Sequence, residues 1–560
     1  MYMNPNMKLK DFPYEHLEIE EIKQKLELFM EEFSQAGSKE EQFMVHQRFY
    51  EYTSHVDTMI RLCEFRHSID TKDAYYEKEN KHCDAIRPQI EYLKAEFKKK
   101  MLASKWRDFL EEKIGKNAFV SMELLAKSED ARLIDLKKEE NELMSRYDEK
   151  MAQVMVSFDK KEYNLSQMGK FLTDGDRKTR ERAYKAYTDA LMGICGEVED
   201  VYDKLVKNRN RQALAIGEKN YVTLGYWSMN RNCYDEAQVK KFRDNVKKYW
   251  VPFAEKIHER KRLRLGVDKL SYIDRGVAFS YGNPAPTGTP QDILDGGKKM
   301  YTEMSKETKE FFDTLIRREM FDVLGRPGKK NGGYMEYLPE YRLPLIFANF
   351  NGTSGDVDVV THECGHAFQG YLVADTEIAE HQEITMDVAE IHSMSMEFFA
   401  EPWCGLFFGD KADDYIQMHL EDAVTFIPYG CMVDEFQHII YENPDMTVKE
   451  RNQTWLALEK EYRPHMDYTG NAYYEAGRFW QKQLHIFDCP FYYIDYCFAQ
   501  IGALQFKIAM DKDRADAWER YIRLCRYSAK GNFLEALGHV GLKSPFEEGT
   551  FADIIHSLES

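Results

Sequence analysis

Long charged segments with helical periodicity, seldom interrupted by proline, constrain the fold of this chain more than any other feature. Only 16 of its 560 residues are proline. In residues 15–36, apolar side chains recur at spacings of about three and four, which places them on one face of an α-helix: Leu17, Ile19, Ile22, Leu26, Phe29 and Phe33. Residues 147–159, residues 180–217 and the C-terminal third continue the pattern. The sequence therefore predicts a mostly α-helical protein.

Signals for β-strands are few and lie close together in the middle of the chain. Glycines and prolines bracket two short runs, residues 333–338 and 343–350, which fit a small antiparallel sheet or hairpin. Upstream of them, a helix is expected to start with Thr289 as its N-cap. Directly after them, another helix is expected to begin at Ser354 or Asp356, either of which can cap it.

Length and charge limit the classes of protein to consider. A chain of 560 residues is longer than one compact core usually allows, so two or more packed units are expected. The net charge of −19 argues against a nucleic-acid partner, because phosphate binding needs a basic surface. It argues equally against adsorption to an anionic membrane.

The N-terminus and the cysteines indicate the compartment. The first 26 residues contain no apolar stretch with a small-residue cleavage site, so we expect no secretory signal. No run of about 18 apolar residues is present to span a membrane. The 10 cysteines form no CxxC pair and are expected to be buried or free thiols. We therefore expect a cytoplasmic protein. A monomer or a small homo-oligomer is expected, and the sequence does not choose between them.

The segment THECGH contains His362, Glu363 and His366 in an HExxH arrangement. On a helix the two histidines lie one turn apart on the same face, and both imidazoles can bind one metal ion at about 2.0–2.1 Å. Glu363 would lie beside that ion, where it can accept a proton from a water molecule. The competing interpretation is a pair of surface histidines that bind no common metal ion. The motif favours a zinc site.

A catalytic zinc site usually has three protein ligands and one open position. Five downstream residues are candidates for the third ligand: His381, Glu383, Asp387, Glu390 and His392. From Glu383 onward the segment is expected to form a helix, and one face of it carries Asp387, Glu390 and Glu397. Such a face can simply be solvated, but apolar residues surround it, and buried carboxylates need a cation or hydrogen bonds. Spacing alone does not choose among these residues.

The HECGH motif, followed by MDVAEIHSMSMEFF, resembles the thimet oligopeptidase and oligoendopeptidase F family of zinc metallopeptidases, nearest the bacterial oligoendopeptidase F type. In that family a glutamate on the following helix completes the site, and the matching residue is Glu390. The resemblance implies one Zn²⁺ per chain, held by His362, His366 and Glu390. Asp387 or Ser393, each one turn from Glu390, would orient a ligand histidine. His381 and His392 are expected in helix packing or in solvent.

A tyrosine-rich segment near the C-terminus, HIFDCPFYYIDY, can be a plain aromatic core segment. It also resembles a family segment in which a histidine precedes tyrosines that line the active site. By that resemblance His485, Tyr493 and Tyr496 contact the substrate or the oxyanion, with Tyr496 as the expected oxyanion donor. The role of Tyr492 is left open.

The segment LPLIFANFNGTSG, just before the HExxH motif, resembles the family segment whose edge strand pairs with an extended peptide. The alternative is a purely structural strand. Edge pairing would supply affinity without reading side chains, which suits a peptidase of broad specificity.

The resemblance implies a two-lobed, multi-helical body that encloses a deep channel, with zinc at its floor. Residues 1–160 would form an N-terminal helical region and residues 161–560 the zinc metallopeptidase catalytic region. The implied function is a zinc-dependent oligoendopeptidase that hydrolyses internal bonds of short unfolded peptides, with oligopeptides as its partners. The rival interpretations are a helical zinc carboxypeptidase or dipeptidase, and a metal-free peptide-binding scaffold with a relict site.

Overall fold

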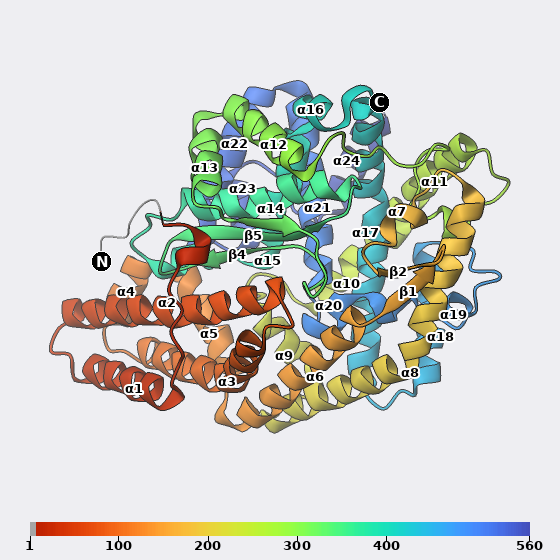
Figure 1. The fold of residues 1–560 in the computed structure, drawn as a ribbon. Helices are drawn as coiled ribbons and strands as arrows, with labels where there is room; N and C mark the ends of the chain where they lie inside the picture. The colour runs from red at the N-terminus through yellow and green to blue at the C-terminus, as the bar shows by residue number, and fades with distance from the viewer. Residues whose placement is uncertain (1–6, 560) are drawn as a thin grey trace.

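Helices dominate the protein, as the periodicity predicted (Figure 1). The computed structural model describes residues 7–559. Residues 1–6, which belong to the stretch in which no secretory signal is expected, and residue 560 lie outside that range. Between residues 7 and 559, no helix is long and apolar enough to cross a membrane. All ten cysteines are free thiols, in agreement with their spacing in the sequence.

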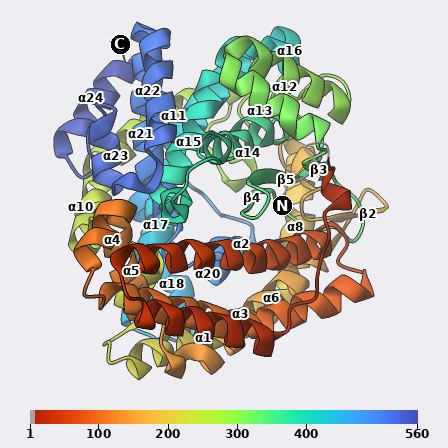
Figure 2. The ribbon, with the colours of Figure 1, turned by 90° about the vertical axis from the view of Figure 1, so that its left-hand side faces the viewer.

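The N-terminal helices form one side of the molecule, drawn in red to orange in Figures 1 and 2. They are α1 (Ile19–Gln35), α2 (Lys39–Ile69), α3 (Ala74–Leu102), α4 (Arg107–Ile114), α5 (Lys116–Ser128) and α6 (Ile134–Ala152). The predicted apolar face of α1 buries four side chains against α2 and α3: Ile22, Leu26, Phe29 and Phe33.

A short hairpin follows where the sequence suggested a continuous helix. α6 ends at Ala152, and β1 (Met155–Phe158) pairs antiparallel with β2 (Lys161–Asn164). Exposed and buried side chains alternate along β1, with Val156 and Phe158 buried. This period of two is typical of a strand that covers a core with one face. The expectation of a helix beyond Ala152 in this segment was therefore wrong.

Five further helices lead to the central part of the chain. They are α7 (Gly169–Leu172), α8 (Arg177–Ala215), α9 (Tyr221–Ser228), α10 (Glu236–Asn245) and α11 (Val251–Leu265). The long helix α8 agrees with the prediction for residues 180–217.

The central segment carries the second sheet and the HExxH helix. Its elements are α12 (Pro290–Met304), α13 (Lys306–Arg317), β3 (Phe321–Leu324), β4 (Tyr334–Leu338), β5 (Leu343–Phe350), α14 (Gly355–Leu372) and α15 (Met386–Phe399). Thr289 caps α12 by accepting a hydrogen bond from the Asp292 backbone N–H, as predicted. Ser354 holds the N-cap position of α14 without a capping hydrogen bond. Asp356 instead accepts from the backbone N–H groups of the preceding loop.

The strand order in this sheet is β3–β5–β4. The predicted hairpin is present as the antiparallel pair β4–β5, and β3 adds to β5 in parallel, which the sequence did not suggest. β5 is therefore the central strand, and its first six residues are buried. The expectation that residues 343–350 form the open edge was wrong, because both sides of β5 are hydrogen-bonded. β3 and β4 are therefore the two edge strands.

The C-terminal helices complete the molecule, drawn in cyan to blue in Figure 1. They are α16 (Gly405–Phe408), α17 (Ala412–Glu442), α18 (Val448–Tyr462), α19 (Ala472–Glu475), α20 (Leu484–Asp488), α21 (Tyr493–Lys512), α22 (Arg514–Tyr527), α23 (Phe533–His539) and α24 (Glu548–Glu559). α15 packs on both α14 and α21. The helix with the predicted third ligand thus lies between the HExxH helix and the tyrosine-rich segment.

A cavity of about 950 Å³, partly open to solvent, lies between two lobes, which agrees with the channel that the resemblance implied. One wall comes from α2, α3 and α5, and the other from β4, α14, α15 and the segment around residues 485–496. Figure 2 shows α2 passing on one side, with β4 and α15 on the other. α6 packs against α8 across residue 160. The division of the chain at that residue stays a prediction.

Candidate metal centre and catalytic site

Three potential metal ligands converge on the cavity wall. His362 and His366 lie one turn apart on α14, and Glu390 comes from α15. The Nε2 atoms of the two histidines lie 3.3 and 3.4 Å from Oε2 of Glu390. Two atoms that bind one tetrahedral ion at about 2.05 Å are about 3.3 Å apart. The spacing and the His₂Glu donor set therefore fit a divalent transition-metal ion.

A glycine within the motif allows this approach. A Cβ atom on Gly365 would lie 2.6 Å from Cα of Ser393 and 2.7 Å from the carbonyl oxygen of His392. Any side chain at this position would push α14 away from α15. Because Glu390 belongs to α15, the glycine of HECGH allows the third ligand to reach the two histidines.

The ligand histidine His362 is held by the carboxylate of Glu397. Nδ1 of His362 lies 2.5 Å from Oε1 of Glu397, and Oε2 of the same carboxylate lies 2.5 Å from Nε2 of His419 on α17. Burial would raise the pKa of Glu397, but its hydrogen bonds to both histidines outweigh that effect and hold it near 2. A carboxylate on Nδ1 fixes the tautomer in which Nε2 of His362 carries a lone pair for a metal.

Glu390 is held from both sides of its carboxylate. Ser393 donates to Oε2 at 2.8 Å, and the Tyr492 hydroxyl donates to Oε1. Asp387 instead accepts a hydrogen bond from Tyr234 at 2.8 Å. The sequence analysis expected Asp387 or Ser393 to orient a ligand histidine. In the described part of the chain neither of them bonds one, and the carboxylate that bonds His362 is Glu397.

Glu363 lies in the cavity wall between the ligand histidines and β4. Burial raises the pKa of its carboxyl group, while the nearby His362 and His366 and a hydrogen bond from the Met335 backbone N–H lower it. A carboxylate in this position is a suitable proton acceptor beside a metal ion.

His485 and Tyr496 also line the cavity. The Tyr496 hydroxyl lies 3.4 Å from Nε2 of His485. Burial raises the pKa of Tyr496, so its hydroxyl keeps the proton that an oxyanion donor needs. Tyr493 is not among the residues that line the cavity; its ring packs against Phe426 and Tyr429.

The tautomer of His485 is set by a chain of hydrogen bonds that the sequence did not reveal. The Tyr429 hydroxyl donates to Oε1 of Gln483 at 2.6 Å, and Nε2 of Gln483 lies 2.9 Å from Nδ1 of His485. The Gln483 amide therefore donates to Nδ1, and Nε2 carries the proton. Burial lowers the pKa of His485 to about 4, so the ring is neutral near pH 7.

The open edge of β4 adjoins the metal ligands. In β5, the Ile346 N–H bonds the Met320 carbonyl on the β3 side. Its partner in β4, Met335, therefore turns its backbone groups away from β5, as does Tyr337 two residues on. Arg61 on α2 already donates to the Tyr337 carbonyl at 2.6 Å, and the Tyr337 N–H bonds the Glu336 side chain.

The two remaining histidine candidates lie away from the ligand cluster. His381 bonds the Ile114 carbonyl at 2.8 Å. His392 is fully buried, with its ring near that of Tyr521. Both therefore sit in packing positions, as expected.

Comparisons with known proteins agree with this arrangement. Residues 9–128 match the Peptidase M3 N-terminal domain, and residues 297–523 match Peptidase family M3. The oligoendopeptidase F homolog of Borreliella burgdorferi is 23% identical over 396 residues, which cover 66% of this chain and 63% of that protein.

Two solved structures extend the likeness over the whole chain. PZ peptidase A with an inhibitor is 41% identical, with a TM-score of 0.97, and the alignment covers 99% of this chain and 98% of that one. A protein of Bacillus anthracis strain Ames, classed as an oligoendopeptidase F, is 39% identical with a TM-score of 0.93, over 99% of this chain and 97% of that one. The chain belongs to peptidase family M3.

Proposed function

We propose that this protein is a zinc-dependent oligoendopeptidase that hydrolyses internal bonds of short, unfolded peptides. The observation that carries the proposal is the convergence of His362, His366 and Glu390 beside Glu363, on the wall of the cavity between the two lobes and next to an open strand edge. A metal ligand set, a base and a surface for an extended backbone are the parts that peptide hydrolysis at a metal needs.

One Zn²⁺ would be held by His362, His366 and Glu390, which provide the His₂Glu set typical of catalytic zinc. When bound, zinc supplies Lewis acidity toward the scissile carbonyl and lowers the pKa of a water molecule. Glu397, Ser393 and Tyr492 keep the ligand side chains in place.

The chain's own groups perform the proton transfers. Glu363 takes a proton from the attacking water and delivers it to the leaving amine. The Tyr496 hydroxyl and the Nε2–H of His485 face the cavity and donate hydrogen bonds to the oxygen of the scissile carbonyl as negative charge develops there. Tyr493 supports this pair from outside the cavity by packing against His485, with ring centroids 4.9 Å apart.

The substrate class follows from the shape of the site. A cavity of about 950 Å³ is at the upper end of the range of ligand pockets, about 300–1,000 Å³. Its walls come from both lobes, so a folded protein could not reach the ligands. The Met335 N–H donates to Glu363, but its C=O turns away from β5 and can pair with a peptide backbone whatever the peptide's side chains.

The test is Glu363→Gln, which keeps the shape of the side chain but removes the base. We expect zinc content to stay at the wild-type level, while cleavage of a fluorogenic peptide falls by at least about 10²–10⁴-fold. Glu383→Gln is the matched control, because Glu383 also lines the cavity but lies outside the ligand cluster. Cleavage at the wild-type rate by the Glu363 variant would refute the proposal.

A second experiment separates endopeptidase from exopeptidase activity. Peptides blocked at both termini should be cleaved as well as free ones, with products identified by mass spectrometry. A requirement for a free terminus would favour the carboxypeptidase or dipeptidase interpretation. Absence of bound zinc, together with inactivity, would favour a scaffold.

A further inference from the structure

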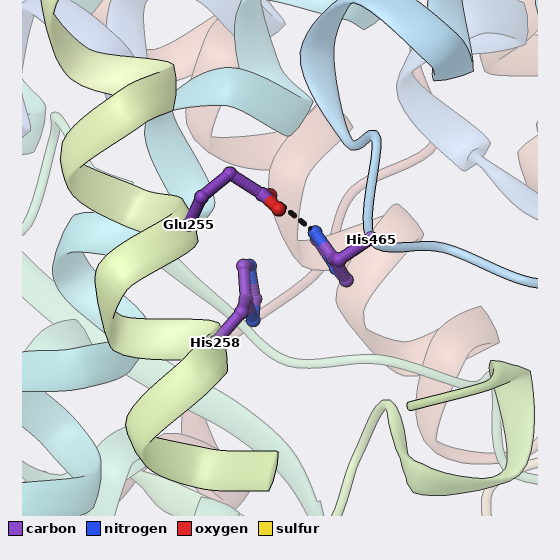
Figure 3. Close-up of side chains that lie close together, drawn as sticks. All are labelled: Glu255, His258 and His465. Carbon is purple, nitrogen blue, oxygen red and sulfur yellow. Dashed lines mark hydrogen bonds and ion pairs between the residues drawn. The ribbon is translucent and has the colours of Figure 1, made fainter. Parts of the chain in front are cut away.

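A second group of metal-ligating side chains lies outside the catalytic cavity. Glu255 and His258 come from α11, and His465 follows the end of α18 (Figure 3). One ligand atom of each residue lies within 4.8 Å of those of the other two. None of the three lines the cavity described above.

Figure 3 shows the Glu255 carboxylate directed toward His465, with the His258 ring beside them. Nδ1 of His465 lies 2.6 Å from Oε1 of Glu255. The rings of His258 and His465 stack with their centroids 3.5 Å apart. Two imidazoles and one carboxylate form the same donor set as the catalytic cluster, and this set suits Zn²⁺.

The backbone holds these donors in place. Glu255 and His258 are three residues apart on α11 and are therefore neighbours on one face. His465 belongs to a turn closed by a hydrogen bond of 3.0 Å from the Met466 N–H to the Arg463 carbonyl. The Asp467 carbonyl then accepts from the Tyr272 N–H at 2.9 Å, which anchors the end of the turn.

Two cations near the cluster are bound to other groups. Arg463 donates to Glu459 at 2.9 Å, and Lys261 donates to the Arg275 carbonyl at 2.8 Å. The Glu255 side chain is 31% exposed and the His465 side chain 12% exposed, so an ion can reach the group from solvent. Glu255 remains as the carboxylate that would compensate the charge of a bound cation.

We propose that Glu255, His258 and His465 form a second, structural zinc site that fastens α11 to the turn after α18. This site does not depend on the proposed function, because its residues take no part in the catalytic cavity. The competing explanation is a stacked histidine pair that only packs.

Zinc content separates the two explanations. The full-length protein is saturated with Zn²⁺, desalted and analysed by mass spectrometry of metals. We expect about two zinc ions per wild-type chain and about one per His258→Ala chain. The His366→Ala variant, in which the catalytic cluster is broken, should also keep about one zinc ion per chain. The double variant, which combines His258→Ala with His366→Ala, should hold close to none.

One control variant and a second variant of the site test whether any loss of zinc is specific to this cluster. His55→Ala removes a histidine that bonds a carboxylate, Glu340, at 3.0 Å, but forms no three-ligand group within the described residues. Its zinc content should equal that of the wild type. Glu255→Gln keeps the side-chain shape and should lose the same ion as His258→Ala, even if the alanine variant folds poorly.

The results distinguish this proposal from the catalytic one. If His258→Ala and Glu255→Gln hold as much zinc as the wild type, the second site is refuted, whatever the activity. If His366→Ala loses no zinc while His258→Ala does, the second site stands and the catalytic assignment fails. Addition of Zn²⁺ to His366→Ala should raise its unfolding temperature, and the same addition should leave the double variant unchanged.

Discussion

Replacing Glu397 with glutamine tests whether a residue that touches no substrate controls the affinity for the metal. Both oxygens of Glu397 contact imidazoles, Nδ1 of His362 and Nε2 of His419, each at 2.5 Å. Glutamine preserves the volume but replaces two charged hydrogen bonds with neutral ones. A hydrogen bond to a charged group contributes about 1.5–3 kcal/mol and a neutral one about 0.5–1.5 kcal/mol.

The bond to His362 alone therefore loses about 1.5 kcal/mol, or about tenfold in zinc affinity. Loss of the negative charge behind the ligand weakens binding further, within the range of about 10- to 100-fold for outer-shell partners. The Tyr415 hydroxyl cannot take over the hydrogen bond of Glu397 to His362, because it already donates to Asp358 at 2.5 Å.

The assay is competition for zinc between the protein and a chromophoric chelator, followed by peptide cleavage at saturating zinc. We expect the zinc dissociation constant to rise by about 10- to 100-fold, and most of the activity to return when zinc is in excess. Glu401→Gln is the control, since Glu401 lies four residues further on and pairs with Lys507 at 3.1 Å. Equal zinc affinity in Glu397→Gln and the wild type would refute the reasoning.

Three further predictions concern the cavity. Tyr496→Phe should lower kcat by about 10²-fold with little change in KM, because the oxyanion loses one donor; steady-state kinetics would check this. Tyr492→Phe removes the hydroxyl that bonds Glu390, so zinc affinity should fall. At saturating zinc its kcat should change less than that of Tyr496→Phe, and a larger loss of kcat in Tyr492→Phe would contradict the two roles. Arg61→Ala frees the Tyr337 carbonyl, so cleavage-site mapping by mass spectrometry should show a shifted set of products, and an unchanged set would argue against pairing at β4.

The sequence predicted the parts of the site that depend on local geometry. His362 and His366 are one helical turn apart, and this spacing alone predicts two ligands on one face. Glu397 was visible on the same helical face as Glu390, but a sequence does not show that Nδ1 of His362 lies above that face. His419 and Gln483 gave no signal, because their positions depend on how α17 and α20 pack.

Two other features that the sequence did not predict have physical causes of the same kind. Tyr492 stood in the tyrosine cluster, but only the start of α21 one residue later directs its hydroxyl to Glu390. Which strands are the edges depends on β3, a four-residue strand just upstream of the hairpin that pairs in parallel with β5. Such pairing is decided by tertiary packing, which strand propensity cannot give.

The contact between Arg61 and β4 links the geometry of the lobes to the surface that a peptide meets. Arg61 belongs to α2 in one wall of the cavity, and Tyr337 to β4 in the other. A peptide strand that pairs with the Tyr337 carbonyl must therefore displace the guanidinium of Arg61 and break a link between the two walls. A peptide that pairs only with Met335 leaves that link intact.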